Sequence, residues 1–510
     1  MRNATPEQIF TVAKQYHKEG NLDQAEALYK AVLSVKPASA EAWFFLGMVR
    51  YAKGAQFEAV DLIKKALEID PKNYDFHNNI GEIYRRNNMM TEAEFHLKAS
   101  LTLKPDNTDA HSNLGLIYKA AGEIDKAKLC FSNALQCNPK NVNAILNAGS
   151  LYQSLNELTD ALECYLAAMT LDPDNPHALR GAAYCMTEQG EYNTAAGMLS
   201  RLTAGKPDLF REKVDLAFLT LRNKDFRKGL QLLESRLKHL PEILEGPEKT
   251  LWRGTPLKAK TLYVYYEKQG LSGFGDTLMF MRFIHDLKKY EPQKVVFRVQ
   301  TPLLELVKAN MPDFAEATDE PCAEYDVHSP LISLMLILNV RAKSMSLAEG
   351  YIKADGERFK NLTDSSKTNI AVVFKTSEKH TKHERRSVPQ EIFDKPAGDD
   401  SLKLFYVSAQ EPESPLHANI TDMRPHIANF QDTADILAAM DMVITADTAV
   451  AHLAGAMGIN CALLLDHLHD WRWFTAKTGQ NTVWYSSVTT YIRENDMTWD
   501  DTLSLVKIKK

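Results

Sequence analysis

Residues 106–139 read DNTDAHSNLGLIYKAAGEIDKAKLCFSNALQCNP, and the same pattern recurs throughout the first half of the chain. A small residue such as Gly115 and an alanine such as Ala127 stand at fixed offsets before the proline that ends each unit. A spacing kept over six intervals indicates a repeated structural unit. The prolines are 34 residues apart, at Pro37, Pro71, Pro105, Pro139, Pro173, Pro207 and Pro241.

The repeat has the tetratricopeptide signature, in which each unit forms two helices and small residues lie where the helices cross closely. Proline ends the second helix because it lacks the amide hydrogen and clashes with the preceding turn. The last unit, Glu212–Pro241, has Gly229 where earlier units have alanine, so we expect a degenerate capping repeat. The pattern predicts an all-α solenoid of about seven units over residues 1–243. Such solenoids usually hold an extended peptide or a partner protein, and self-association or simple spacing is the alternative.

The composition is that of an ordinary globular protein, with 510 residues, 45% of them apolar and 25% charged. It excludes disorder or a collagen-like structure for most of the chain. The net charge is −6 and neither half of the chain is basic, so we expect no nucleic-acid partner. The six cysteines include no C-x-x-C pair and no zinc spacing, which indicates reduced thiols in a reducing compartment.

Targeting and membrane-spanning segments are not expected. The first ten residues, MRNATPEQIF, lack the basic and then apolar build of a signal peptide. The longest apolar stretch, Leu331–Val340, is too short to span a bilayer. The sequence therefore predicts a cytoplasmic protein without membrane insertion.

After Pro241 the 34-residue period stops and the pattern changes. Residues 244–260 carry proline, glycine and charged residues, and we expect them to form a linker. A strand at Thr261–Tyr266 then leads into a helix at Asp276–Tyr290, and a second series starts with a strand at Asn369–Phe374. This second series continues with a strand at Met442–Thr445, a helix at Ala449–Met457 and a strand at Cys461–Leu465.

Alternating strands and helices predict parallel sheets with crossover helices. We expect an α/β region of two Rossmann-like lobes, residues 261–367 and 368–510. Ligands collect at the carboxyl ends of parallel strands, so the cleft between these lobes is the expected site.

The first candidate motif is Gly270–Thr277, sequence GLSGFGDT, between the first strand and its helix. Gly273 and Gly275 allow the backbone to approach a ligand closely, and the helix start that follows favours an anion. The glycine order is neither that of a dinucleotide-binding loop nor that of a P-loop. Asp276 is either a simple helix N-cap or, in a cleft, a carboxylate base that takes a proton from a nucleophile.

The second motif is Ile444–Gly455, sequence ITADTAVAHLAG, a strand end followed by a helix of small residues. The amides of Thr448 and Ala449 at the helix start suit a phosphate or a diphosphate. The alternative is structural, with Asp447 as the N-cap and His452 as a packed core histidine.

Two further stretches follow strands of the second series. The basic run Lys375–Pro389 either forms a solvated loop or supplies a cation, such as Lys375, that neutralises a leaving phosphate. The stretch Asp470–Phe474, sequence DWRWF, is either an amphipathic helix turn or a set of aromatic rings that stack on a nucleotide, with Arg472 as a clamp.

Taken in order, these motifs resemble the bacterial tetratricopeptide-linked glycosyltransferases whose catalytic region is related to the lipopolysaccharide heptosyltransferases. The resemblance covers nearly the whole chain and rests further on Tyr325–Leu334, Arg386–Pro389 and Phe430–Ala434. It implies a two-lobed GT-B fold, a nucleotide-activated sugar held mainly by the second lobe, and no essential metal or other cofactor.

The resemblance also implies a role for each candidate residue. Asp276 would be the catalytic base, and Asp326 and His328 would lie on the acceptor side. The donor-binding residues would be Gly273, Gly275, Lys375, Asp447, Thr448, Ala449, His452 and Arg472.

The sequence departs from the family pattern in two places. The loop Gly270–Gly275 is longer than the family's Gly-Leu-Gly-Asp by two residues, which affects the reach of Asp276. Asp466–His469 replaces the family's Pro-Phe-Ala-Pro, which affects the choice of donor. His467 and His469, with Arg472, would suit the second anion of a CMP-activated nonulosonic acid.

The function that the resemblance implies is transfer of a sugar from a nucleotide donor to Ser or Thr of a protein held by the repeats. Some members of the family modify flagellin with nonulosonic acids, so flagellin is the leading acceptor. The alternative is a non-catalytic tetratricopeptide adaptor or chaperone with a degenerate nucleotide-sugar-binding region. A nucleotide-dependent oxidoreductase is excluded, because the dinucleotide-binding loop and its ribose carboxylate are missing.

Overall fold

The computed structural model describes residues 4–269, 271–341, 350–376, 383–474 and 477–508. The chain divides into two compact units, Met1–Met186 and Thr187–Lys510. Within the described residues, no helix combines the length and the apolar content that crossing a membrane requires.

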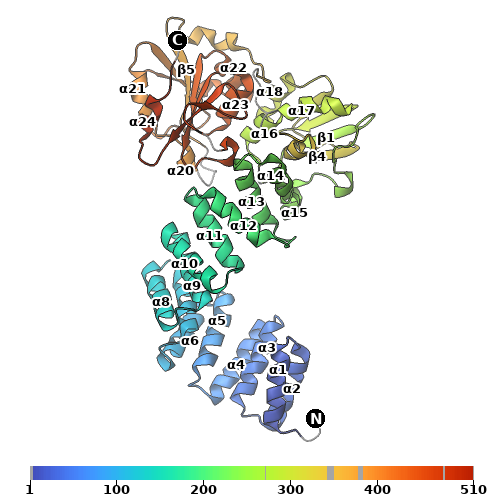
Figure 1. The fold of residues 1–510 in the computed structure, drawn as a ribbon, viewed down its shortest axis with the longest axis vertical. Coiled ribbons are helices and arrows are strands. Elements are labelled where there is room, and N and C mark those ends of the chain that lie inside the picture. The colour runs from blue at the N-terminus through green and yellow to red at the C-terminus, as the bar shows by residue number, and fades with distance from the viewer. Residues whose placement is uncertain (1–3, 270, 342–349, 377–382, 475–476, 509–510) are drawn as a thin grey trace. The chain divides into compact units, whose positions relative to one another are not determined.

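The first unit is built from antiparallel helix pairs, as predicted for a tetratricopeptide solenoid (Figure 1). The first helix of each of the first five pairs has 13 residues and the second has 14. The ten helices are α1 (Pro6–Lys18), α2 (Leu22–Val35), α3 (Ala40–Ala52), α4 (Gln56–Ile69), α5 (Tyr74–Arg86), α6 (Met90–Leu103), α7 (Thr108–Ala120), α8 (Ile124–Cys137), α9 (Val142–Ser154) and α10 (Leu158–Leu171).

The repeated residues explain this regularity. A Cβ atom added to Gly115 would lie 2.8 Å from the ring of Phe131, so only glycine lets α7 and α8 cross this closely. The side chain of Asn107 caps the start of α7 by accepting from the amide of Ala110. Proline follows two residues after the end of α8, at Pro139, where it stops the helix.

Helices of the repeat type continue into the second unit. These are α11 (Pro176–Glu188), which crosses the division, α12 (Tyr192–Thr203), α13 (Phe210–Arg222), α14 (Phe226–Leu233) and α15 (Arg236–His239). Apolar residues of α13 and α14, among them Leu221 and Leu230, share one core with Leu262 and Trp484 of the sheet region. The 34-residue period of the sequence ends at Pro241, whereas the second compact unit already begins at Thr187.

The first sheet has four parallel strands in the order β3-β2-β1-β4. Its strands are β1 (Thr261–Tyr265), β2 (Lys294–Arg298), β3 (Ala315–Thr318) and β4 (Val327–Pro330). The helices of this region are α16 (Phe274–Phe280), α17 (Arg282–Asp286), α18 (Leu304–Ala309) and α19 (Leu334–Ile337). The single helix predicted at Asp276–Tyr290 is therefore divided into α16, α17 and a final 3-10 turn.

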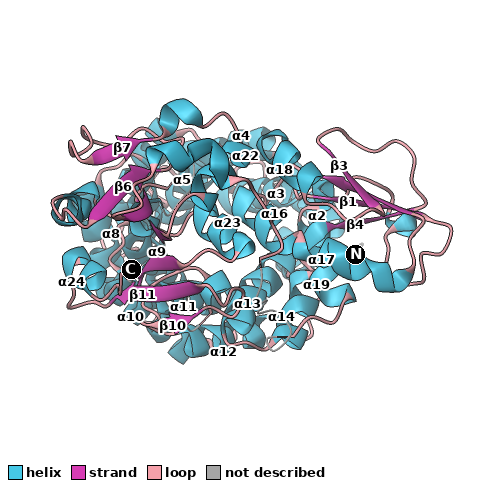
Figure 2. Ribbon diagram, turned by 90° about the horizontal axis from the view of Figure 1, so that it is seen from above, coloured by secondary structure: helices cyan, strands magenta, loops and turns pink. Residues whose placement is uncertain are grey.

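The second sheet has seven strands in the order β10-β11-β9-β8-β5-β6-β7, and all pairs except β10 with β11 are parallel. Figure 2 labels β6 and β7 towards one edge of this sheet and β10 and β11 at the other. Its strands are β5 (Thr368–Val373), β6 (Leu402–Tyr406), β7 (Ile420–Asp422), β8 (Met442–Thr445), β9 (Cys461–Asp466), β10 (Gln480–Asn481) and β11 (Val488–Arg493). Its helices are α20 (His383–Arg386), α21 (Asp394–Ala397), α22 (Phe430–Ala438), α23 (Ala449–Met457) and α24 (Trp499–Ser504). The two parallel sheets confirm the α/β character predicted for the C-terminal region.

Candidate functional site

The candidate residues of the two sheet regions meet at a pair of opposite charges, Arg472 and Asp276. Arg472 lies on the turn Trp471–Trp473 that follows β9, and Asp276 lies in α16, which follows β1. Nε and Nη2 of Arg472 both lie 2.7 Å from Oδ1 of Asp276. Nη1 of Arg472 donates to Oδ1 of Asp470 at 2.8 Å. One guanidinium therefore bridges two carboxylates from distant parts of the chain.

Burial and ion pairing shift the pKa values of these charged groups in opposite directions. Burial lowers the pKa of the Arg472 guanidinium, but Asp276 and Asp470 outweigh burial and raise that pKa above its ordinary value. Burial raises the pKa of Asp470, but Arg472 and Arg386 outweigh burial and hold that pKa well below its usual range. Arg472 and Asp470 are thus both charged at neutral pH.

Asp276 is the third residue of its helix and not the N-cap, which is Gly273. The Gly273 amide donates to Oδ2 of Asp276 at 3.3 Å. One oxygen of the carboxylate thus stabilises the helix start, and the other receives Arg472. This arrangement corrects the view of Asp276 as a simple N-cap.

A second charged pair marks the start of α23. The carboxylate of Asp447 lies 2.9 Å from Nε of Arg386 and accepts from Nε1 of Trp473 at 2.9 Å. The N-cap is Thr448, whose hydroxyl accepts from the Val450 amide, so the N-cap alternative for Asp447 is also corrected. The first helical residue is Ala449, whose amide lies at the positive end of the helix dipole.

His452 of α23 is packed among aromatic side chains of the second sheet region. The ring of His452 stacks on Trp473 with centroids 4.7 Å apart, and its Nδ1 lies 3.1 Å from the Tyr485 hydroxyl. Burial, together with nearby Arg472 and Arg386, lowers the pKa of His452 to about 3, so the ring is neutral.

A side chain at position 275 would prevent the close approach of α16 to α23. A Cβ atom added to Gly275 would lie 2.7 Å from Cδ2 of His452 and 3.6 Å from Cα of Ala449. The helices α16 and α23 are in direct contact along this line. Gly275 therefore acts on the packing of the two helices, and His452 has a packed position in the same contact.

Three of the predicted residues lie outside this cluster. Asp326 accepts from the Thr261 amide at the amino end of β1. Asp276 instead follows the carboxyl end of this strand. His328 is fully buried in β4, where its Nδ1 meets the Tyr265 hydroxyl at 2.9 Å. Lys375 follows β5, and its Nζ lies 3.8 Å from a carboxylate oxygen of Glu413. Positions 377–382 of the basic run lie outside the described residues.

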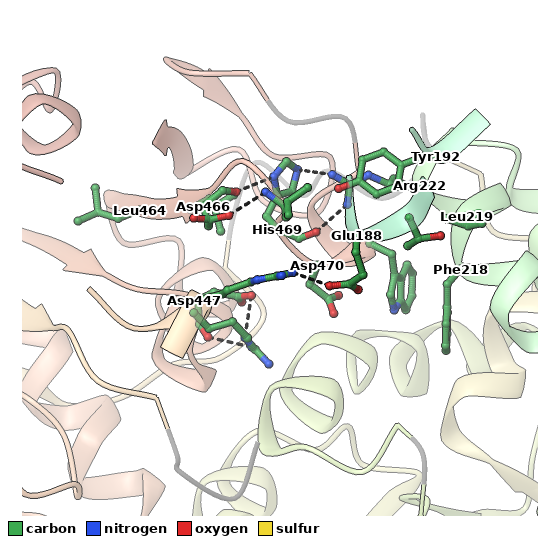
Figure 3. Close-up of a pocket in the computed structure, with 16 residues that line it drawn as sticks. Glu188, Tyr192, Phe218, Leu219, Arg222, Asp447, Leu464, Asp466, His469 and Asp470 are labelled. Atoms are coloured by element: carbon green, nitrogen blue, oxygen red, sulfur yellow. Dashed lines mark hydrogen bonds and ion pairs between the residues drawn. The ribbon is translucent and has the colours of Figure 1, made fainter. Parts of the chain in front are cut away.

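A pocket of about 200 Å³ opens beside the cluster (Figure 3). Helices α11 to α13 form one wall, and the segments after β8 and β9 form the other. Arg385 pairs with Glu188 at 2.7 Å across the pocket, and Nη1 of Arg222 donates to the His469 carbonyl at 2.7 Å. Phe218 and Trp471, which also line the pocket, stack on each other.

The sequence did not identify the helical wall of this pocket. Glu188 and Arg222 are 34 residues apart and occupy the same position in successive repeats. Earlier repeats have Ala120 and Ser154 at this position, and both are exposed. Arg222 is 4% exposed, but the sequence around it has no pattern that separates it from a surface residue. Its contacts in the folded protein separate it: the guanidinium lies 3.8 Å from the centre of the Tyr192 ring and donates to the His469 carbonyl.

The cluster offers cations and helix amides rather than metal ligands. Among the residues that the structure describes, no group of three or more His, Cys, Asp or Glu side chains could hold a metal ion. Arg386 and Arg472 lie near the start of α23, which is a suitable environment for a bound anion such as a phosphate.

Comparison with known proteins identifies the repeats. Models of the tetratricopeptide repeat match residues 13–74, 62–95, 108–141 and 142–175. The N-terminal region therefore consists of tetratricopeptide repeats. No curated protein matches the chain.

Several solved structures are similar to part of the chain. PilF of Pseudomonas aeruginosa is 23% identical with a TM-score of 0.38, and the match covers 42% of this chain and 96% of that one. PilW, a type IV pilus biogenesis factor, is 19% identical with a TM-score of 0.39, over 42% of this chain and 99% of that one. TTC0263, a tetratricopeptide repeat protein of Thermus thermophilus, is 20% identical with a TM-score of 0.32, over 36% and 100%.

Proposed function

We propose that the second unit is a metal-independent glycosyltransferase of the GT-B type, and that the repeats hold its protein acceptor. One observation carries the proposal. Motifs that are far apart in the sequence, Gly273–Asp276, Asp447–His452 and Asp470–Trp473, form one contact cluster beside two parallel sheets. The carboxyl ends of such strands are where α/β proteins bind ligands.

The proposed reaction moves a sugar from a nucleotide to a Ser or Thr hydroxyl. The bond between the anomeric carbon and the phosphate oxygen breaks, a bond to the acceptor oxygen forms, and the nucleotide leaves as an anion. The amides of Thr448 and Ala449, with Arg386, would stabilise the charge that develops on the phosphate. Asp276 would accept the proton of the hydroxyl.

This mechanism requires Arg472 to leave Asp276 before the proton is transferred. Oδ1 of Asp276 already accepts two guanidinium hydrogen bonds and Oδ2 accepts the Gly273 amide, so an acceptor hydroxyl has to displace a donor to reach the carboxylate. A phosphate that enters beside α23 would compete for Arg472. In the proposed cycle, donor binding therefore releases Asp276, and the base becomes available only when the donor is in place.

A CMP-activated nonulosonic acid as donor and flagellin as acceptor remain proposals drawn from the resemblance. His469 lends no cation to the carboxylate of such a sugar. Its Nδ1 and Nε2 lie 3.1 Å and 2.9 Å from the carbonyl oxygens of Asp466 and Phe474, and burial lowers its pKa. His467 lies 3.1 Å from the carboxylate of Asp466. Arg472 is the member of this set that contacts the cluster.

The second candidate is a tetratricopeptide adaptor without catalysis. The observation that favours it is the pairing of Asp276 and Asp447 with Arg472 and Arg386, because neutralised carboxylates suit a structural role as well as a resting enzyme. The two functions differ in whether the acceptor is covalently changed.

Intact mass spectrometry distinguishes the glycosyltransferase from the adaptor. The full chain is incubated with purified flagellin and a panel of CMP-, UDP- and GDP-sugars, with Asp276→Asn as the matched control. The proposal expects flagellin to gain the mass of one or more sugar residues with one donor of the panel, and expects the control to be slow. Retention of flagellin by the chain without a mass change under any donor would favour the adaptor.

A further inference from the structure

The first unit contains a cavity of about 410 Å³ to which no role has been assigned. It lies between α8, α9 and α10, which are neighbours in the solenoid (Figure 1). Its floor is apolar and includes Phe131 and Leu151, which are 2% and 1% exposed. Its rim carries three charged side chains, Lys128, Asp160 and Glu163.

The charges of the rim do not balance. Nζ of Lys128 pairs with the carboxylate of Glu157 at 2.7 Å, so its charge is already neutralised within the chain. Asp160 and Glu163 are exposed and form no hydrogen bond or ion pair with any other described residue. At the opening of this apolar cavity one cation, Lys128, thus faces the three carboxylates of Glu157, Asp160 and Glu163, which leaves a net negative charge.

The preceding repeat shows what normally occupies this place. Thirty-four residues earlier, Ser132, Asp160 and Glu163 correspond to Lys98, Lys126 and Leu129. Nζ of Lys98 pairs with Glu94 at 2.6 Å, and Nζ of Lys126 lies 5.3 Å from the centre of the Tyr118 ring. In that repeat Lys126 lies over the ring of Tyr118, the counterpart of Tyr152, while Leu129 is 62% exposed.

Three side chains at this place therefore differ between the two repeats. Serine in place of Lys98 removes a long side chain, and carboxylates in place of Lys126 and Leu129 remove a cation and an apolar group. The remaining space and negative charge suit a long side chain with a cationic end, such as the lysines of the preceding repeat. A lysine or arginine has an apolar stem for the floor and a cationic end for the rim.

From this comparison we infer that the cavity between α8, α9 and α10 binds a lysine or arginine side chain of a partner polypeptide, next to an apolar residue of the same partner. The inference does not depend on glycosyl transfer, and it holds for an enzyme and for an adaptor alike.

The cavity is separate from the polar side of the repeats. On α9, Asn147 donates to the Ser112 hydroxyl and Ser150 accepts from Lys119, both towards α7. Leu151 and Tyr152 of the same helix line the cavity instead. A partner in the cavity would therefore contact a different side of α9.

Fluorescence anisotropy of the full chain with three labelled peptides of 12 residues tests the inference. The first peptide alternates Lys-Leu pairs with Gly-Ser, the second has Glu for Lys, and the third has Ser for Leu. We expect the first peptide to bind and each of the others to bind at least about tenfold more weakly. Binding of the first peptide should weaken as salt is raised, because the carboxylates of the rim are exposed.

The variant Asp160→Lys with Glu163→Leu is the decisive change. It restores two of the three residues of the preceding repeat, at exposed positions, so we expect unaltered circular dichroism and thermal unfolding. Affinity for the Lys-Leu peptide should fall at least about tenfold. The control is Glu68→Lys, a charge reversal at an exposed site of α4. Equal binding to the double variant, or equal binding of the Glu peptide, would overturn the inference.

Cysteine alkylation locates the bound peptide. The thiol of Cys164 lines the cavity, and burial raises its pKa to about 11, so it reacts slowly with N-ethylmaleimide. The Lys-Leu peptide should slow this reaction further while leaving exposed Cys137 unaffected. Equal protection of both cysteines, or protection of neither, would show that the peptide binds elsewhere and would also overturn the inference.

Discussion

The ring of Trp471 stacks on the ring of Phe218, with centroids 5.5 Å apart and planes inclined by 15°. Trp471 precedes Arg472 in the turn that meets Asp276, and Phe218 belongs to α13, the first helix of the last, degenerate repeat. Phe226 at the start of α14 makes a second aromatic contact, with Phe474. The last repeats thus support the turn that presents Arg472, in addition to being part of a solenoid.

Because of these contacts, we expect a fragment that ends at residue 243 to be incompletely folded. A fragment of residues 1–243 would expose Phe218 and Phe226, which lie against the sheet region in the intact protein. We expect this fragment to bind the dye ANS strongly and to unfold over a broad temperature range. The full chain is the control and should bind little dye. A fragment that unfolds sharply without dye binding would support the sequence-based boundary at residue 243.

A buried ion pair gives a prediction on stability. Arg236 of α15 lies 2.7 Å from the carboxylate of Glu267 and donates to Ser333 at 2.9 Å, and its side chain is 4% exposed. Arg236→Met should lower the free energy of unfolding of the second unit by about 3–5 kcal/mol, because Glu267 is left buried without its cation. The double variant Arg236→Met with Glu267→Gln should regain most of this loss. Chemical denaturation measures both, and equal losses in the single and double variants would contradict the prediction.

Two glycines offer a matched comparison. At Gly275 a methyl group would lie 2.7 Å from His452, so we expect Gly275→Ala to cost about 1–3 kcal/mol of stability. At Gly197 in α12 nothing lies within 4 Å of the added atom, and alanine should stabilise the helix by about 0.5–1 kcal/mol. Thermal unfolding should therefore shift in opposite directions. Shifts of the same sign would mean that α16 and α23 do not pack as closely as described.

The sequence predicted the main elements well where the pattern is strong. β8 and α23 begin and end at the predicted residues, and β1 and β9 differ by one residue at their ends. β3, β4, β7, β10 and β11 were not predicted. The first four have two to four residues and carry polar residues or proline, as in the VHSP of β4, and the longer β11 carries two threonines and an arginine. Their strand conformation comes from pairing with neighbours, which a local pattern does not encode.

The residues of the candidate site also divide into those that a motif predicts and those that only tertiary packing reveals. Asp276, His452 and Arg472 belong to recognisable motifs, and the structure brings them together. Phe218 and Arg222 lie in a degenerate repeat, where their positions look like those of surface residues. They become part of the pocket only through contacts with segments about 250 residues later in the chain. Such contacts depend on tertiary packing and leave no spacing to detect.

His452 predicts an acid-dependent loss of stability. Its pKa is lowered from its ordinary value to about 3 in the folded state, so the unfolded chain binds the proton more tightly. Stability of the second unit should therefore be complete above the unfolded pKa of about 6.5 and should fall as the pH drops towards 3. His452→Phe keeps a ring against Trp473 and should flatten this dependence, whereas replacing exposed His426 should not. Equal slopes of unfolding free energy against pH in wild type and His452→Phe would contradict the assignment.

The last prediction concerns Asp276 and Arg472 together. Asp276→Asn keeps an oxygen for the Gly273 amide, so the start of α16 should remain folded. It removes the charge that holds Arg472, so the guanidinium becomes available to a phosphate. If Asp276 is the base, turnover should fall by roughly 10²–10⁴ while affinity for the donor nucleotide is kept or increased. Calorimetry with CMP and UDP measures the affinity, and the mass gain of the acceptor measures the turnover. Arg472→Met is the matched variant: it frees the carboxylate but removes the phosphate contact, so we expect weaker nucleotide binding. If Asp276→Asn transfers sugar at the wild-type rate, the carboxylate only positions Arg472, and the proton must leave by another route.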